Sequence, residues 1–168
     1  MENLLDSNQT EALSKIITAY KKSIGRCCFY MPIGYGVTRV ISMSIDSILI
    51  KNPYARIMVL FRTKLECLQF ESVISSIDSR HTCTSNVKNY HEHSILNITY
   101  NSYFVNYEKL RNNKFDVIIC FNAEQINSAK YNPILSTECD LLLGVFSSKY
   151  SDKNNLFADS SFSHIFLL

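Results

Sequence analysis

Long apolar runs that alternate with helical stretches limit the fold of this chain more than any other feature. Three runs, at residues 55–61, 115–121 and 140–146, are almost wholly apolar, with no regular alternation of apolar and polar residues. Strands of this kind are buried on both faces, which is typical of a parallel sheet covered by helices. Further strands are expected at 95–100 and 163–168. The sequence therefore predicts an α/β fold with a mostly parallel sheet and helices on both faces.

Amphipathic stretches between these runs predict the helices. At 6–24, apolar residues recur at steps of three and four, and Asp6 or Ser7 is placed to cap the start. The stretch at 63–77 predicts another helix. Its expected inward-facing residues are Leu65, Leu68, Val73 and Ile77.

Length and charge restrict the function. With 168 residues, of which 46% are hydrophobic, the chain fits one domain with a substantial core. Its formal net charge of +2 is too small to hold nucleic acid by bulk electrostatics, so any such contact must be local. The start has no apolar signal segment and no run reaches membrane-spanning length. We therefore expect a cytoplasmic protein that does not bind a membrane.

The cysteines and histidines form no recognisable metal motif. Six cysteines in a reducing cytoplasm are expected to be free thiols, and none of them has the CxxC spacing of a zinc site. The polar, irregular stretch 78–93 contains another group of possible ligands: His81, Cys83, His91 and His93. We interpret that stretch as a surface loop, and no metal site is expected. Cys120, at the end of a strand, has no clear histidine partner that would make it a nucleophile.

A glycine-containing loop follows the first strand candidate and precedes a helix. It reads MPIGYGVT, from Met31 to Thr38. In such a setting, backbone N–H groups and the helix N-terminus together bind phosphate. The loop resembles the MPTGTGKT motif of superfamily-two helicases and of the motor subunits of type I and type III restriction enzymes. It departs from that motif at Val37, which stands where the family has its lysine.

The resemblance extends along nearly the whole chain. Gln9 matches the glutamine that reads adenine in this family, at a similar distance before the loop. Four later segments correspond to family motifs in order and spacing: VLFRTKLECLQF at 59–70, NITYNSY at 97–103, FDVIICFNAEQI at 115–126 and LLLGVFSSK at 141–149. The resemblance implies a three-layer, RecA-like domain of the P-loop NTPase type over residues 1–168. It corresponds to the first motor domain of a helicase, with no second motor domain and no nuclease domain.

The residues that carry the family's ATP chemistry are replaced. Phosphoryl transfer needs a lysine on the phosphates, an acid that holds Mg²⁺ and a base that orients water. The lysine is Val37, and the aspartate and glutamate of the DEAH-type motif are Phe121 and Asn122. The following histidine is Glu124, which is offset too far to take over the acid's role without a different backbone path. The family's LTATP has become VFSSK at 145–149. The comparison implies a domain with no catalytic residues.

Part of a phosphate site remains. Gly34, Gly36 and the start of the next helix can offer N–H groups to an anion, and Arg39 adds positive charge. Thr38 can ligate Mg²⁺ if a nucleotide brings it in. Together with Gln9 these residues are our candidate site for weak binding of ATP, ADP or another anion, although no cofactor is expected. Alternatively, the glycines remain only because the turn requires them.

A nucleic-acid face is implied by the segment 97–103. The family's threonine in TTYNSL helps to hold a nucleic-acid backbone, which assigns Thr99 to this face, with Arg62 and Tyr100 beside it. The aromatic residues of 100–108 could form a stacking platform for bases. We interpret them instead as a core edge or a protein interface.

These observations favour a degenerate, non-hydrolysing motor domain that acts as an interaction or scaffold module. By family association, we expect it to work in restriction or phage defence, with a protein partner or with the other domains of a larger helicase-like assembly. One alternative is a DNA-binding module that does not depend on ATP. Another is the nucleotide-binding lobe of an ATPase that receives its missing groups from a partner.

Overall fold

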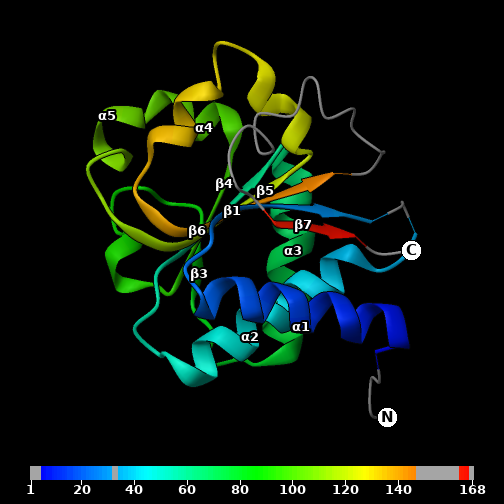
Figure 1. Cartoon of the computed structure of the whole chain (residues 1–168). Coiled ribbons are helices and arrows are strands. Elements are labelled where there is room, and N and C mark those ends of the chain that lie inside the picture. The colour runs from blue at the N-terminus through cyan, green and yellow to red at the C-terminus, as the bar shows by residue number, and fades with distance from the viewer. Residues whose placement is uncertain (1–4, 32–33, 147–162, 167–168) are drawn as a thin grey trace.

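Seven parallel strands form one sheet in the computed structural model, which describes residues 5–31, 34–146 and 163–166 (Figure 1). The order is β3-β4-β2-β5-β6-β1-β7, and each pair of neighbours runs parallel. The strands are β1 (Gly25–Tyr30), β2 (Ile57–Phe61), β3 (Cys83–Thr84), β4 (Ile95–Thr99), β5 (Phe115–Phe121), β6 (Cys139–Phe146) and β7 (Ser163–Phe166). The predicted parallel α/β fold is confirmed.

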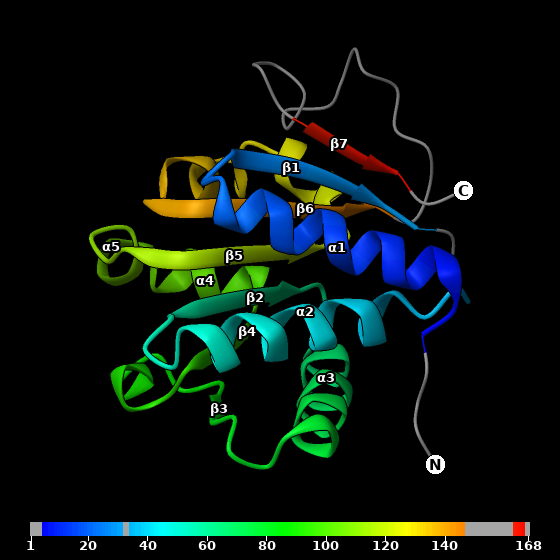
Figure 2. The ribbon, with the colours of Figure 1, turned by 60° about the horizontal axis from the view of Figure 1, so that its bottom comes forward.

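Helices cover both faces of the sheet. One layer holds α1, α2 and α3, and the opposite layer holds α4, α5 and the short 3-10 helices (Figure 2). The α-helices are α1 (Ser7–Lys21), α2 (Val37–Lys51), α3 (Lys64–Ile77), α4 (Tyr100–Val105) and α5 (Tyr107–Leu110). The 3-10 helices are η1 (Tyr90–Glu92), η2 (Ala123–Asn127) and η3 (Asn132–Ser136). Among the residues described, no helix is long and apolar enough to cross a membrane.

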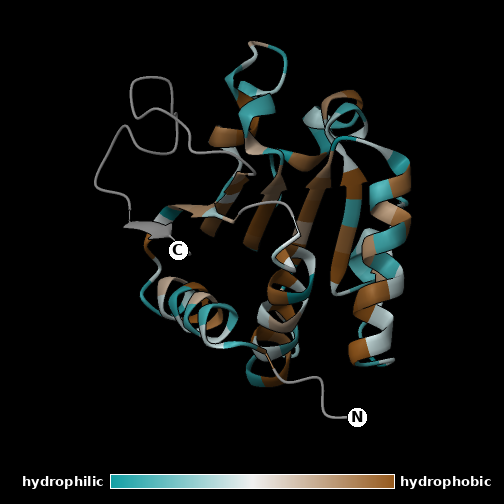
Figure 3. Ribbon diagram, turned by 90° about the vertical axis from the view of Figure 1, so that its right-hand side faces the viewer, coloured by the Kyte–Doolittle hydropathy of each residue, from teal (hydrophilic) through white to brown (hydrophobic). Residues whose placement is uncertain are grey.

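The strands supply apolar side chains to two cores. In β2, Val59 and Phe61 face the layer of α1, α2 and α3, whereas Met58 and Leu60 face the opposite layer. Because successive side chains of a strand point to opposite faces, a strand buried between two layers must be apolar throughout. Figure 3 shows the apolar strands inside, with helices that are apolar on one side. This explains the unbroken apolar runs of the sequence.

Capping boxes set the starts of two helices. Asp6 accepts a hydrogen bond from the Gln9 N–H at 2.8 Å, and the Gln9 side chain accepts one in return from the Asp6 N–H. Thr63 and Glu66 make the same reciprocal pair at the start of α3. Each pair satisfies two backbone donors that a helix start leaves open. Asp6 is thus the cap of α1.

The predicted inward face of α3 is wrong at Leu65 and Leu68, while the other two predicted residues, Val73 and Ile77, are half-buried. Leu65 and Leu68 are 65% and 54% exposed, and the fully buried positions are Cys67, Phe70 and Ile74. These three positions also follow a helical stripe, and at about 100° per residue it lies on roughly the opposite side of the helix from Leu65 and Leu68. The Phe70 ring contacts Phe61 with a centroid separation of 5.3 Å, so tertiary packing selects its stripe over the leucines.

Two local features could not be assigned from the sequence. The stretch 78–93 contains β3, whose two residues pair with β4 at the edge of the sheet, followed by η1. A strand of two residues is too short to leave a periodic pattern. After β4 the helical residues begin at Tyr100, and a break at Asn106 that no sequence pattern indicated divides them into α4 and α5.

Candidate functional site

The loop between β1 and α2 has the backbone of an anion site. Gly36 is the N-cap of α2 with a φ of 76°, and Gly34 has a φ of 91°. Both values lie in the left-handed region, which glycine adopts without strain. In the part of the loop that the structure describes, no side chain caps α2, so the first N–H groups of this 15-residue helix remain available to an anion. Pro32 and Ile33 lie outside the described residues.

Gln9 contacts this loop across 26 residues of sequence. Its Nε2 donates to the carbonyl of Tyr35 at 3.1 Å, while its Oε1 accepts from the Asp6 N–H at 3.2 Å. A Cβ added at Gly36 would lie only 2.8 Å from Gln9 Nε2. The structure therefore brings Gln9 and the loop together, with the amide bracing the loop. These two bonds use one of the two Nε2 hydrogens and one of the two Oε1 lone pairs, so the amide can still form further hydrogen bonds.

Thr38 and Arg39 line a pocket between α2 and α3. The pocket has a volume of about 620 Å³, and its other lining residues are Gly36, Met43, Val73, Ser76 and Ile77. Nη2 of Arg39 is buried and lacks a hydrogen-bond partner among the described residues. A buried donor without a partner is costly unless a ligand or water satisfies it. Arg39 thus supplies a cationic donor next to the glycine loop.

An aromatic cluster occupies the carboxyl end of β5, where the family has its acid. Phe121 is the last residue of β5 and only 7% exposed. Its ring stacks on Phe61 with a centroid separation of 4.5 Å and an interplanar angle of 18°, and it lies 6.3 Å from the ring of Phe70. The sequence showed that an acid was missing but did not reveal this cluster. Phe61 and Phe121 each end a strand, which is the signal that could have suggested it.

Among the described residues, those that stand in place of the family's lysine and acids carry no charge. Val37 is the first residue of α2 and packs against the core. Asn122 follows β5 with a φ of 50°, and Glu124 lies beyond it in η2. Val145 is 4% exposed in β6, and the rest of the segment 145–149 after Phe146 lies outside the described residues.

The three expected nucleic-acid residues have different positions. Phe61 pairs with Thr99 across β2 and β4, so Arg62, which is exposed, emerges beside Thr99. Thr99 caps α4 by accepting a hydrogen bond from the Ser102 N–H at 3.1 Å. Tyr100 is only 2% exposed, and its hydroxyl donates to the Phe121 carbonyl at 2.6 Å. The assignment of Tyr100 to a nucleic-acid face is corrected, because its hydroxyl anchors β5 in the core.

The cysteines are unsuited to nucleophilic catalysis. All six are thiols outside disulfides, and burial raises the pKa of the Cys67 thiol to about 11 and that of Cys139 to about 12. The pKa of Cys120 is also raised by burial. A thiol with so high a pKa is almost wholly protonated near neutrality, and the protonated form is a poor nucleophile.

The histidines of 81–93 are distributed among separate partners. His81 Nε2 lies 2.8 Å from Asp46 Oδ1, whereas His91 Nδ1 lies 2.7 Å from a guanidinium nitrogen of Arg56. The grouping of His81, Cys83, His91 and His93 in sequence is therefore not reproduced as one ligand cluster among the described residues.

Comparison with known families decides what this domain is. The family model of the type III restriction enzyme res subunit matches residues 3–145, most of the chain. The chain belongs to this family. The order of the matched elements, with the glycine loop after β1, agrees with the RecA-like motor domain of superfamily-two helicases.

A solved structure supports the fold of this restriction-subunit domain. The chain is similar to the Sulfolobus solfataricus SWI2/SNF2 ATPase core in complex with dsDNA, with a TM-score of 0.82 and 12% sequence identity. The match covers 94% of this chain and 35% of that one, so the chain spans about a third of its structural relative. No curated protein matches the chain.

Proposed function

We propose that this res-subunit-like domain does not hydrolyse ATP and that it acts as an interaction or scaffold module, in restriction or phage defence. The observation that carries the proposal is the packing of Phe121, which is buried against Phe61 and near Phe70 where hydrolysis would need an acid. Residues that form a core cannot at the same time hold a hydrated magnesium ion.

The magnitudes support the loss of hydrolysis. Removing one group that stabilises developing charge typically costs about 2.7–4 kcal/mol of transition-state stabilisation. Here three such groups are replaced, by Val37, Phe121 and Asn122. The losses need not add, but even one or two of them lower a typical turnover number below the range of working motors.

A weak anion site is part of the proposal. The open start of α2, the left-handed Gly34 and Gly36, and Nη2 of Arg39, which has no hydrogen-bond partner in the described part of the chain, support binding of a phosphate group without Mg²⁺-dependent chemistry. The missing lysine, which Val37 replaces, weakens the binding of a nucleotide's phosphates. We expect other domains or a protein partner to complete the functional assembly, since the chain spans 35% of its structural relative.

Measurement of ATP turnover tests this function directly. We expect phosphate release by the unmodified chain, with and without DNA, to equal that of a buffer blank. Val37→Lys should remain inactive because Phe121 and Asn122 are unchanged, and Val37→Ala serves as a matched control for disturbance of the helix start. Magnesium-dependent turnover by the unmodified chain, abolished by Thr38→Ala, would refute the proposal.

Binding of DNA is the second candidate function. Arg62 and Lys64 are exposed at the carboxyl end of the sheet, and Lys130 contacts Asn101 of α4 at 3.0 Å on the same side. The structural relative is described as a complex with dsDNA. Gel-shift titrations at low and moderate salt, with the chain and with Arg62→Ala, would test this function, because phosphate contacts weaken steeply with salt. Binding that does not change with salt or with Arg62→Ala would exclude this face.

A further inference from the structure

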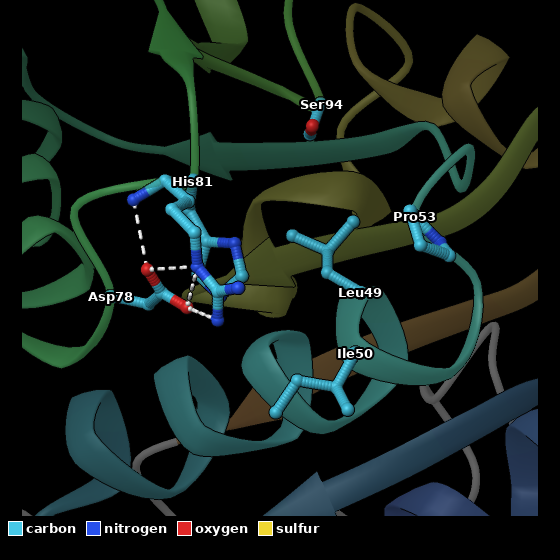
Figure 4. Close-up of a pocket in the computed structure, with 7 residues that line it drawn as sticks. Leu49, Ile50, Pro53, Asp78, His81 and Ser94 are labelled. Atoms are coloured by element: carbon cyan, nitrogen blue, oxygen red, sulfur yellow. Dashed lines mark hydrogen bonds and ion pairs between the residues drawn. The ribbon is translucent and has the colours of Figure 1, made fainter.

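Three side chains from distant parts of the sequence converge beside α2. Asp46 comes from the middle of α2, Asp78 from the C-cap of α3 and His81 from the segment that follows. Each offers one ligand atom, and these atoms all lie within 4.8 Å of one another. The side chain of His81 is only 9% exposed, and those of Asp78 and Asp46 are 15% and 20% exposed. Figure 4 shows Asp78 and His81 side by side, across a pocket from Leu49 and Ile50.

The electrostatics of this place favour a cation. The C-terminal end of a helix carries partial negative charge, which basic residues usually offset. α3 has 14 residues, no basic residue in its last turn and an aspartate at its C-cap. The neighbouring cation is Arg80, whose Nε lies 2.9 Å from Asp78 Oδ2, but its side chain is 83% exposed. The negative charge of two carboxylates and a helix end is thus offset by the Arg80 guanidinium, which is exposed to solvent and can adopt another rotamer.

We propose that Asp46, Asp78 and His81 form a binding site for a divalent transition metal, with Zn²⁺ as the preferred class of ion. A set of one imidazole nitrogen and two carboxylate oxygens suits Zn²⁺ and its neighbours, whereas Mg²⁺ and Ca²⁺ prefer oxygen ligands alone. Zinc lies about 2.0–2.2 Å from such atoms and is mostly tetrahedral, which places its ligand atoms about 3.4 Å apart. Because the three atoms all lie within 4.8 Å of one another, a side-chain adjustment of about 1.5 Å or less brings them to that spacing.

The surroundings allow the coordination to be completed by solvent. A pocket of about 290 Å³ adjoins Asp78 and His81 and is lined also by Ser94 and Arg80. It has room for water molecules as further ligands. Binding would displace Arg80 from Asp78 and would connect the middle of α2 to the segment after α3. Asp46 lies nine residues after Val37, about 13 Å along the helix, so this site is separate from the glycine loop.

Metal binding to the whole chain tests the proposal. Equilibrium dialysis of the metal-free protein against Zn²⁺ should give one tightly bound ion per chain, and Co²⁺ should give a ligand-field absorption spectrum that Zn²⁺ abolishes. Asp46→Asn and His81→Gln should each weaken binding at least tenfold. The matched control His91→Gln, which changes a histidine outside the cluster, should leave binding unchanged.

Arg80→Ala separates a metal site from a simple ion-pair network. If Arg80 competes with the metal for Asp78, its removal should strengthen Zn²⁺ binding several-fold, even if a ligand variant proves unstable. The proposal is overturned by less than one bound ion per chain, by binding that Asp46→Asn leaves unchanged, or by weaker binding in Arg80→Ala. Retained binding in a variant with Cys67 and Cys83 replaced by serine supports it, whereas loss of binding there would assign the metal to the thiols.

Discussion

Replacement of Phe121 by alanine provides the sharpest test of how this domain uses the end of β5. The Phe121 ring is 7% exposed and contacts two other aromatic rings, so truncation opens a cavity in the core. Truncation of a buried phenylalanine typically costs about 3–5 kcal/mol, of which aromatic pairing accounts for about 0.5–1.5 kcal/mol per pair. For a domain of this size, a loss of about 4 kcal/mol lowers Tm by roughly 8–16 °C. Phe121→Asp should be worse, since it buries a carboxylate without a partner.

Urea unfolding followed by circular dichroism would measure this loss. Phe104→Ala is the matched control, because Phe104 is 47% exposed and its notable ring partner is the Lys130 ammonium, 5.1 Å from the centroid. We expect the control to lose about 1 kcal/mol or less. If Phe121→Ala costs no more than Phe104→Ala, or if saturating Mg²⁺ and ATP stabilise Phe121→Asp more than the unmodified chain, the argument that the acid site has become core is refuted.

Three further predictions concern the helices and loops. Ile74→Ala should lower the free energy of unfolding, measured by urea titration, by about 2–5 kcal/mol, and Leu68→Ala by less than about 1 kcal/mol. A larger loss in Leu68→Ala than in Ile74→Ala would show that the assigned inward face of α3 is wrong. Gly36→Ala should lower the free energy of unfolding by about 1–2 kcal/mol, because residue 36 has a positive φ and the new Cβ would lie 2.8 Å from Gln9 Nε2. In a Gln9→Ala background that close contact is absent, so a double-mutant cycle should show a smaller loss. Hydrogen bonds from Arg80 lower the pKa of Asp78 from 3.8 to about 2. The contribution of this ion pair to the free energy of unfolding is therefore present above about pH 4 and is lost as the pH falls through 2. A ¹³C NMR titration of the Asp78 carboxyl should show this midpoint, and in Arg80→Ala the midpoint should return toward 3.8.

The sequence alone determined the class of the fold and the chemical character of the loop. The unbroken apolar runs of β2, β5 and β6 could belong only to strands covered on both faces, because apolar surface must leave water. Local backbone rules also limited the cap of the first helix to Asp6 or Ser7 and explained the glycines before α2. The loss of charge at Val37 and Phe121 needed no structure either, since it depends on residue identity.

Only the tertiary structure decided which surfaces meet. The sequence of α3 contains two apolar stripes, and contact of Phe70 with Phe61 and Phe121 turned one of them inward. Periodicity could not choose between them, because it records the spacing along one helix and not the shape of the opposing sheet. Likewise, the buried Tyr100 bonds Phe121, which is 21 residues away in sequence. Asp46 contacts His81, which is 35 residues away. Such pairings depend on how the chain crosses over between strands, and that is a property of the packed molecule.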